Sequence, residues 1–329
     1  MWKNKKILVT GADGFIGSHL TEKLVASGAK VRAFVYYNSF NHWGWLDSIP
    51  ESTLKKIDVF TGDIRDPHGV VQACKDMDVI FHLAALIGIP FSYHSPDSYV
   101  DTNIKGTLNV LQAAKRWKAQ KVIHTSTSEV YGSAQYVPID ENHPINPQSP
   151  YAATKSAADS LALSFYRSFD LPVAILRPFN TFGPRQSARA IIPTIISQVY
   201  SGKKEIHLGN VHASRDFNYV ENTVNAFLKV ALVKEAIGEV FNSGSGQEAT
   251  VAETIELIGK ITGKKIKFSI DPQRLRPQKS EVERLLCNAS KIQNICGWQE
   301  LISFEEGLKK TCRWIKDNLK VYKAGIYNV

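Results

Sequence analysis

Long apolar runs are absent from this 329-residue sequence. No stretch reaches the ~18 consecutive apolar residues typical of a transmembrane helix, so we expect no membrane attachment. The first residues run directly into an apolar strand and a glycine turn, which leaves no room for a secretory signal. Cysteine is also scarce: Cys74, Cys287, Cys296 and Cys312 form no CxxC pair and have no nearby histidine pattern. We therefore predict reduced, mostly structural cysteines, no metal site and a cytoplasmic protein.

Repeats, low-complexity segments and disordered linkers are missing as well. Hydrophobic residues make up 43% of the chain, enough for a sizeable core in one large or two modest domains. The net charge is +9, and lysines cluster at 3–6, 203–204 and 260–267. These clusters lack interleaved aromatic residues and a recognisable binding module, so nucleic acid is not an expected partner. They are either solvated faces or a source of attraction for an anionic substrate such as a nucleotide diphosphate.

A glycine turn follows the first predicted strand. Residues 7–10 are an apolar strand, three glycines spaced by two residues follow at 11–17, and an apolar-periodic helix continues to Val25. The first glycine permits a tight turn, the second lets the backbone approach a pyrophosphate, and the third lets the helix pack on the strand. The pyrophosphate would rest on the helix N-terminus. The residues predicted to bind a dinucleotide here are Gly11, Gly14, Phe15, Ile16 and Gly17.

The second predicted strand, 31–36, ends without the carboxylate that normally accepts the ribose hydroxyls of NAD. No arginine follows it to bind the extra phosphate of NADP. Asn38 and Ser39 are the hydrogen-bonding residues at this strand end, and they are candidates for the ribose. NAD is therefore the favoured cofactor.

Two further strand ends carry cofactor candidates. After the strand 57–61, Asp63 either binds the adenine amine or closes a turn. After the strand 79–82 comes a turn of small residues, and His82 is expected to be a packed strand histidine rather than a catalyst. The residues predicted to line the cofactor at these two ends are Asp63, Ile64, Leu83, Ala84 and Ala85.

Tyr151 and Lys155 are predicted to share one face of a helix. Ser149 is a suitable N-cap and proline is favoured at the first helical position, so Tyr151 falls in the first turn and Lys155 lies one turn on. An ammonium ~4 Å from a phenol favours the phenolate by about 4 kcal/mol, and the helix N-terminus acts in the same direction, whereas burial opposes both. We expect the lysine to acidify the tyrosine enough to take a proton from a sugar hydroxyl.

The order of the predicted elements defines the fold class. Strands alternate with helices, including a long helix at 96–117, which predicts an α/β fold with a Rossmann-type, doubly wound parallel sheet. We expect a cofactor-binding domain at 1–180 and a smaller α/β substrate-binding domain at 181–329, with a segment near 205–235 returning to the first sheet. Capping boxes are predicted where helices begin, at Thr250 with Glu253 and at Ser303 with Glu306.

Seven ordered motifs carry a resemblance to a known superfamily. They are TGxxGFIG at 10–17, GDIRD at 62–66, HLAA at 82–85, NxxGT at 103–107, STSEVYG at 126–132, YxxxK at 151–155 and RPFNTFGPR at 177–185. The chain resembles the extended short-chain dehydrogenase/reductase superfamily, the NAD-dependent epimerases and dehydratases, over nearly its whole length. The resemblance implies a tightly held nicotinamide cofactor, a nucleotide-sugar substrate bound by the C-terminal part, and a homodimer.

Within that superfamily, several stretches are similar to the bacterial nucleotide-sugar 4,6-dehydratases of legionaminic acid biosynthesis, which serve cell-surface glycans. They include VYYNSFN at 35–41, PRQSARA at 184–190 and RLRP at 274–277. Those enzymes act on N-acetylglucosamine linked to GDP or UDP. The resemblance points to Asn180, Arg215 and Arg276 as nucleotide contacts, with Arg189 a further substrate candidate.

Five residues are predicted to carry the chemistry of such a dehydratase. Tyr151 removes the proton of the sugar 4-hydroxyl, Lys155 supports it, and Thr127 binds oxygen 4. Glu129 then takes the proton from carbon 5. Ser128 stands where most dehydratases of the superfamily have aspartate, so either Glu129 or a water must deliver the proton to the leaving oxygen.

Three alternatives remain open. The order Thr-Ser-Glu also occurs in nucleotide-glucuronate decarboxylases, which would need a cation such as Arg185 or Arg189 for the sugar carboxylate. A 4-epimerase would need Thr127, Tyr151 and Lys155 but would leave Glu129 without a task. A non-catalytic sensor of cofactor or nucleotide sugar is the last alternative, and the intact catalytic residues argue against it.

Overall fold

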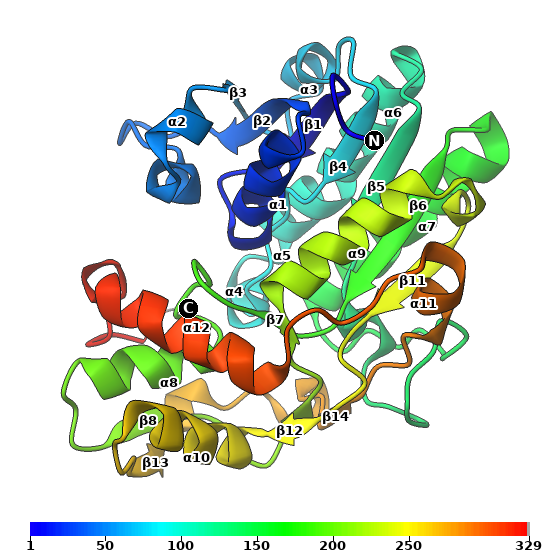
Figure 1. The fold of residues 1–329 in the computed structure, drawn as a ribbon. Helices are drawn as coiled ribbons and strands as arrows, with labels where there is room; N and C mark the ends of the chain where they lie inside the picture. Colours follow the sequence, from blue (N-terminus) through cyan, green and yellow to red (C-terminus); the bar gives the residue numbers. More distant parts are fainter. Residues whose placement is uncertain (328–329) are drawn as a thin grey trace.

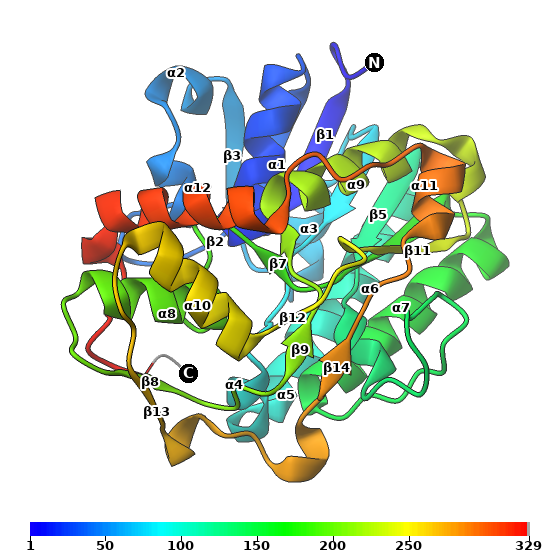
Figure 2. The same cartoon turned by 60° about the horizontal axis from the view of Figure 1, so that its bottom comes forward.

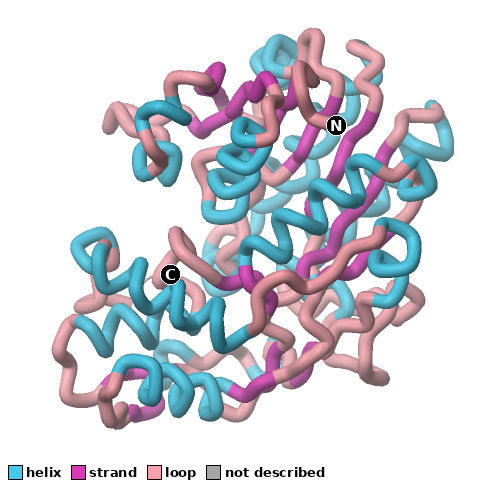
Figure 3. The backbone as a smooth tube through the Cα atoms, viewed as in Figure 1, coloured by secondary structure: helices cyan, strands magenta, loops and turns pink. Residues whose placement is uncertain are grey.

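The computed structural model describes residues 1–327 and contains a central sheet of seven parallel strands (Figure 1; Figure 3). The strands lie in the order β11-β6-β5-β4-β1-β2-β3, and every neighbouring pair is parallel. The order reverses between β1 and β4, and such a switch point in a parallel sheet forms a ligand crevice at the carboxyl ends of the strands. The bounds are β1 (Lys6–Thr10), β2 (Lys30–Tyr36), β3 (Ile57–Gly62), β4 (Val79–His82), β5 (Lys121–Thr125), β6 (Val173–Pro178) and β11 (Val240–Ser243).

Helices cover both faces of this sheet, which confirms the predicted doubly wound fold. In β1, Ile7 and Val9 belong to one buried cluster and Leu8 to the other, because successive side chains of a strand point to opposite faces. One face is covered by α1 (Phe15–Ala26), α9 (Val220–Leu232) and α11 (Ser290–Cys296). The other is covered by α3 (Pro67–Ala73), α6 (Gly106–Arg116) and α7 (Pro150–Phe169). A small helix α2 (Glu51–Leu54) precedes β3.

The long helix expected at 96–117 is interrupted. The chain forms α4 (Ile89–His94), α5 (Pro96–Tyr99), a π-helical turn (Val100–Lys105) and only then α6. Within the π turn, the side chain of Asn103 bonds the backbone N–H and C=O of Leu86 and the hydroxyl of Thr154. Side-chain contacts distant in sequence therefore set the irregularity, and π turns of this kind are frequent at functional sites.

A small lobe lies below the sheet in Figure 1 and is made of short strands and three helices. Its strands pair as β7 (Thr181–Phe182) with β10 (Asn218–Tyr219), β8 (Ile206–Leu208) with β13 (Phe268–Ile270), and β9 (Ser214–Arg215) with both β12 (Ala249–Thr250) and β14 (Arg284–Leu285). Its helices are α8 (Ile191–Tyr200), α10 (Val251–Thr262) and α12 (Phe304–Asp317). The capping box at Thr250 and Glu253 is complete, whereas Ser303 only accepts a bond from the backbone of Glu306.

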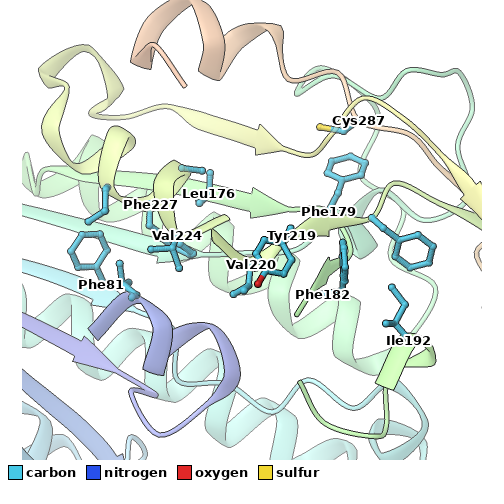
Figure 4. Packing of buried hydrophobic residues seen from close by; sticks show 14 of the residues in the cluster. Phe81, Leu176, Phe179, Phe182, Ile192, Tyr219, Val220, Val224, Phe227 and Cys287 are labelled. Atoms are coloured by element: carbon cyan, nitrogen blue, oxygen red, sulfur yellow. The ribbon is translucent and has the colours of Figure 1, made fainter. Parts of the chain in front are cut away.

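The segment near 205–235 that we expected to return to the main sheet contains α9 (Val220–Leu232), which packs on that sheet. Residues 206–215 belong to the small lobe, α9 packs on the main sheet, and β11 is the strand that joins β6. Figure 4 shows Val224 and Phe227 of α9 beside Phe81 and Leu176 of the sheet. The apolar face of α9 thus fixes the return, and the loop before it does not. The expected second domain ends at residues 328–329, which lie outside the described residues.

All four cysteines are buried and free of disulfides. Among residues 1–327 no helix is both long enough and apolar enough to cross a membrane.

Candidate active site

The glycine turn after β1 has the close contacts that a cofactor cradle requires. Gly11 has φ +67°, and a Cβ on it would lie 2.8 Å from the backbone N of Ala84. A Cβ on Gly17 would lie 2.0 Å from the carbonyl oxygen of Gly11. The helix α1 that follows begins at Phe15 and Ile16, with no side-chain cap and no acidic residue in its first turn. Its first N–H groups are therefore available to an anion, so the turn fits the pyrophosphate of a dinucleotide.

The small-residue turn after β4 is hydrogen-bonded to Thr10, the residue before the glycine turn. The hydroxyl of Thr10 accepts bonds from the backbone N–H of Leu83 and of Ala84, each at 3.1 Å, and Ala85 follows. His82 lies between the hydroxyls of Thr10, at 2.8 Å, and Thr107, at 3.0 Å. Burial and the neighbouring His124 hold the pKa of His82 well below its ordinary value. It is a neutral packed histidine, as the sequence indicated.

The tip of β2 is organised by its own side chains. The amide of Asn38 donates to the carbonyl of His42 at 2.9 Å and accepts from the backbone N–H of Phe40 at 3.0 Å, while Ser39 is exposed. The backbone N–H of Tyr36 donates to the carboxylate of Asp13, which lies in the glycine turn. Sequence reasoning missed Asp13, because only folding brings the first loop against the tip of β2. Asn38 and Ser39 stay predictions as ribose contacts.

The side chains at the tip of β3 also bond to one another. The carboxylate of Asp63 forms a two-pronged ion pair with the guanidinium of Arg65, with an Nε to Oδ1 distance of 2.9 Å. This hydrogen bonding lowers the pKa of Asp63. Ile64 is buried against Gly106 of α6. Asp63 thus has the turn role that the sequence left open, and its contact with adenine stays a prediction.

Three of the predicted catalytic residues lie together where β5 ends and α7 begins. The hydroxyl of Ser149 caps α7 by accepting from the backbone N–H of Ala152. Tyr151 and Lys155 are 7% and 4% exposed, and the Tyr151 hydroxyl shares a hydrogen bond with Thr127. The ring of Tyr99 meets that of Tyr151 edge to face at 6.3 Å. The constellation that the motif predicts is therefore assembled, in a buried setting.

The electrostatics of this pair differ from our expectation. Burial raises the pKa of Tyr151 above its ordinary value, the bond with Thr127 only partly offsets this, and the negative charge of Glu129 adds to it. Burial lowers the pKa of Lys155 to about 8, against a supporting effect of Asp159. The prediction that Lys155 acidifies Tyr151 is wrong for the protein alone, because desolvation by burial is the largest influence on the pKa of each group.

A buried network beneath the pair was not predicted. The carboxylate of Asp159, two turns along α7 from Tyr151, accepts bonds from Ser126 at 2.7 Å and from Nε of Arg177 at 3.1 Å. Arg177 also donates to the hydroxyl of Tyr131 at 2.9 Å. Burial alone would raise the pKa of Asp159, but its partners hold it below the ordinary value. The available signal was the spacing of four residues after Lys155, which places a carboxylate on the same helix face.

Glu129 is near enough to both Tyr151 and Arg215 for its charge to act on each. It belongs to a 3₁₀ turn (Ser128–Tyr131) whose start is capped by Thr127, which accepts from the backbone N–H of Glu129 at 3.2 Å. Its charge adds to the rise that burial causes in the pKa of Tyr151, and it partly offsets the fall that burial causes in the pKa of Arg215. One carboxylate thus acts on both parts of the site. Ser128 is buried beside it.

Two of the predicted substrate arginines meet at one carboxylate. Arg215 of β9 lies 3.2 Å from Oε1 of Glu281, and Arg276 lies 3.9 Å from the same oxygen. Burial lowers the pKa of Arg215, as does the neighbouring Arg276. Among residues 1–327 the buried Nη1 of Arg276 and Oδ1 of Asn180 have no hydrogen-bond partner. Buried polar atoms are normally satisfied, so these two favour a missing ligand.

The arginines of the segment after β7 have different surroundings. Arg185 is buried and bonds Glu22 and Ser18 of α1, so it is not free for a sugar carboxylate, and its candidacy for that role is withdrawn. Arg189 is exposed, and its backbone N and Nε donate to the hydroxyl of Ser187. Burial raises the pKa of Tyr99 and the charge of Arg189 partly offsets this, so Arg189 lies near the ring that packs on Tyr151.

Known proteins resemble this chain over nearly its whole length. The family model described as GDP-mannose 4,6 dehydratase matches residues 8–311. A dTDP-glucose 4,6-dehydratase of Streptomyces niveus is 33% identical over 321 residues, which cover 95% of this chain and 93% of that protein.

Two solved structures extend the comparison. DesIV, the dTDP-glucose 4,6-dehydratase of Streptomyces venezuelae with NAD and TYD bound, has a TM-score of 0.85 at 28% identity, over 97% of this chain and 99% of that one. A UDP-glucuronic acid 4-epimerase of Bacillus cereus with UDP-glucuronic acid and NAD has a TM-score of 0.85 at 29% identity, over 95% and 99%. Both hold NAD, which supports the predicted cofactor. The chain belongs to the GDP-mannose 4,6 dehydratase family, among the NAD-dependent dehydratases and epimerases of nucleotide sugars in the extended short-chain dehydrogenase/reductase superfamily.

Proposed function

We propose that this chain is an NAD-dependent 4,6-dehydratase that converts UDP- or GDP-linked N-acetylglucosamine into a 4-keto-6-deoxy sugar. The observation that carries the proposal is the place of Glu129, whose charge acts on both Tyr151 and Arg215. Elimination of water needs a second base beside the oxidising tyrosine, whereas 4-epimerisation does not. A carboxylate near both the tyrosine and Arg215 meets that need.

Each residue of the proposed site has a separate role in the first step. Tyr151 accepts the proton of the 4-hydroxyl while Thr127 holds oxygen 4. NAD, when bound, supplies a cationic hydride acceptor, and its positive charge favours the phenolate of Tyr151 that burial alone disfavours. The glycine turn at Gly11 and the first turn of α1 would hold its pyrophosphate, and Lys155 its nicotinamide ribose.

Glu129 removes the proton from carbon 5, which the adjacent ketone has made acidic. Ser128 is too weak an acid to protonate a leaving hydroxide at neutral pH. We therefore assign to Glu129 the delivery of the same proton to oxygen 6, so that water leaves and the carboxylate is restored. To complete the 4-keto-6-deoxy sugar, carbon 6 would take hydride back from the reduced cofactor, carbon 5 would take a proton from water, and Tyr151 would release its proton to water. In this scheme Asn180, Arg215 and Arg276 bind the nucleotide diphosphate, since an arginine fork donates two parallel hydrogen bonds to phosphate.

Epimerisation is the second candidate, because the chain matches the UDP-glucuronic acid 4-epimerase as well as the dehydratases. Decarboxylation of UDP-glucuronate is less favoured, since Arg185 is committed to Glu22 and only the exposed Arg189 is left for the sugar carboxylate. We also propose the cytoplasmic location and the homodimer from the resemblance alone.

One incubation separates these activities. Purified protein is incubated with UDP- and GDP-linked N-acetylglucosamine and with UDP-glucuronate, and the masses of the products are measured by mass spectrometry. Loss of water supports dehydration, loss of carbon dioxide supports decarboxylation, and an unchanged mass with inverted carbon 4 in the NMR spectrum supports epimerisation. No product from any substrate, despite bound cofactor, would favour a sensor.

Glu129→Gln tests the assignment of the base. We expect this variant to reduce its bound cofactor on addition of substrate but to form no dehydrated product. Glu305→Gln, which changes an exposed carboxylate on α12, is the matched control and should dehydrate normally. Dehydration by Glu129→Gln at the wild-type rate would show that another group is the base.

A further inference from the structure

Three hydrogen bonds join the small lobe to the main domain beside the proposed site. The hydroxyl of Ser280 donates to the backbone carbonyl of Gln148 at 2.7 Å. The hydroxyls of Tyr93 and Ser280 are 2.7 Å apart, and the side-chain amide of Gln148 donates to the carbonyl of Lys279 at 2.9 Å. Ser280 is only 9% exposed, and Figure 2 shows β14, the strand that follows it in the small lobe, paired with β9. We call Tyr93, Ser280 and Gln148 the inter-lobe bridge.

The direction of the bridge follows from proton counting. A hydroxyl has one proton to donate, and that of Ser280 goes to the carbonyl of Gln148. Tyr93 must therefore be the donor in its bond with Ser280. Tyr93→Phe removes the first bond of this series and leaves the second, whereas Ser280→Ala removes both.

Each end of the bridge is attached to one part of the site. On the small lobe, Ser280 is next to Glu281, which holds Arg215 and Arg276. On the main domain, Gln148 precedes the Ser149 cap of the helix that carries Tyr151.

The third member of the bridge also touches the catalytic part. The ring of Tyr93 packs on the buried cluster of Ile89, Tyr99 and Tyr151. The bridge therefore spans the distance between the arginine pair and the phenol.

We propose that Tyr93, Ser280 and Gln148 are positioning residues that set the spacing between the two nucleotide arginines and Tyr151. The inference rests on the proposed function in taking Arg215 and Arg276 as diphosphate ligands. Both arginines and Glu281 lie within the small lobe, so they stay together when the bridge is broken. Nucleotide affinity is then kept, but the sugar is no longer held against Tyr151, and a displacement of ~1 Å costs about 10²-fold in rate.

The test compares Tyr93→Phe, Ser280→Ala and the double variant with two matched controls. Tyr136→Phe removes a tyrosine hydroxyl that donates to Asp140 within one loop, and Ser201→Ala removes a serine bond to the carbonyl of Gln198 within the small lobe. Binding of UDP, GDP and dTDP is measured by calorimetry, turnover by product formation, and amide exchange over residues 148–155 by mass spectrometry.

We expect nucleotide dissociation constants to be unchanged in all variants. The kcat of Ser280→Ala should fall by about 10- to 100-fold, that of Tyr93→Phe by less, and the double variant should be no worse than Ser280→Ala, because the bonds act in series. Nucleotide binding should slow amide exchange over 148–155 in the wild type and in the controls, but not in Ser280→Ala.

Equal slowing of exchange in Ser280→Ala and the wild type would overturn the proposal, as would a loss of nucleotide affinity that matches the loss of kcat. A wild-type chain that turns over no sugar nucleotide would refute the proposed function, while the exchange measurement would still decide on the bridge. Absence of binding by all three nucleotides to the wild type would refute both.

Discussion

The two parts of the proposed site are built in different ways. Tyr151 and Lys155 lie one turn apart on the 20-residue helix α7, and Thr127 follows a strand of the main sheet. Arg215 lies in a two-residue strand, and Arg276 lies in a loop between short 3₁₀ turns. The first part is fixed by regular backbone and neighbouring elements. The second is fixed by ion pairs between residues far apart in sequence, since Arg215 and Glu281 are separated by 66 positions.

This difference predicts which kinetic constant each part controls. In the proposed mechanism, the buried residues of the regular part touch the reacting atoms, so their loss should lower kcat. In the same proposal, residues of the small lobe hold the nucleotide, so their loss should raise KM with less change in kcat. Variants in the two parts test whether this division is real.

The largest effect is expected for Tyr151→Phe, which removes the proton acceptor and keeps the buried ring. The kcat should fall by about 10²- to 10⁴-fold, the range for loss of a general acid or base. Calorimetry should show unchanged binding of UDP or GDP, because the arginines are untouched. A variant that retained near-wild-type kcat would show that Tyr151 does not carry the proton, and the division between the two parts would fail.

Lys155→Met is expected to lower activity while raising stability, because it removes a buried charge. The pKa of Lys155 in the folded protein, about 8, lies below the ordinary 10.5. Burying the charged amine at neutral pH therefore costs about 3 kcal/mol of folding free energy. Below pH 8 both the folded and the unfolded state bind this proton, and the variant should exceed the wild type in unfolding free energy by up to that amount.

The pH dependence sharpens the Lys155 prediction. Between pH 8 and 10.5 the unfolded state keeps the proton that the folded state has lost, so wild-type stability should rise with pH and the advantage of Lys155→Met should shrink. Denaturant titrations at pH 7 and pH 10 measure this. A constant difference between the two proteins would mean that Lys155 is not desolvated as the fold indicates.

The same division explains what the sequence could predict. The glycine turn, the strand ends and the Tyr151 helix follow from local patterns and short spacings, so they were found from residues a few positions apart. The pKa of Tyr151 was not predicted correctly, because it depends on how completely packing removes water from Tyr151 and Lys155. The π turn was missed because it depends on bonds from Asn103 to Leu86 and Thr154.

In the small lobe, the resemblance identified the arginines but not their surroundings. Glu281 as the shared partner of Arg215 and Arg276 depends on ion pairs that no local pattern contains. The commitment of Arg185 to Glu22 of α1 likewise spans 163 positions. The parallel sheet, by contrast, was predicted from the alternation of strands and helices along the chain, and α9, which packs on it, falls within the predicted range 205–235.

Arg276→Ala should weaken binding of the sugar nucleotide. Hydrogen bonds to charged groups contribute about 1.5–3 kcal/mol, so the KM for the sugar nucleotide should rise by roughly 10- to 100-fold with a smaller change in kcat. Arg274→Ala is the matched control two residues away, because Arg274 pairs with Asp271. Initial-rate measurements over a range of substrate decide the split. Equal effects of the two substitutions would remove Arg276 from the nucleotide site.

Ser128→Ala should have the smallest effect of the set. If Glu129 both removes the proton at carbon 5 and delivers it to oxygen 6, the serine hydroxyl does not transfer a proton, and water loss should slow by less than about tenfold. Loss of a true general acid would cost about 10²- to 10⁴-fold instead. Rapid-quench measurement of the dehydrated product, with cofactor reduction followed in parallel, separates the two steps. A large fall in the rate of water loss, with normal cofactor reduction, would mean that Ser128 relays the proton. The regular part of the site would then contain a catalytic role that the position of the residue in the backbone does not predict.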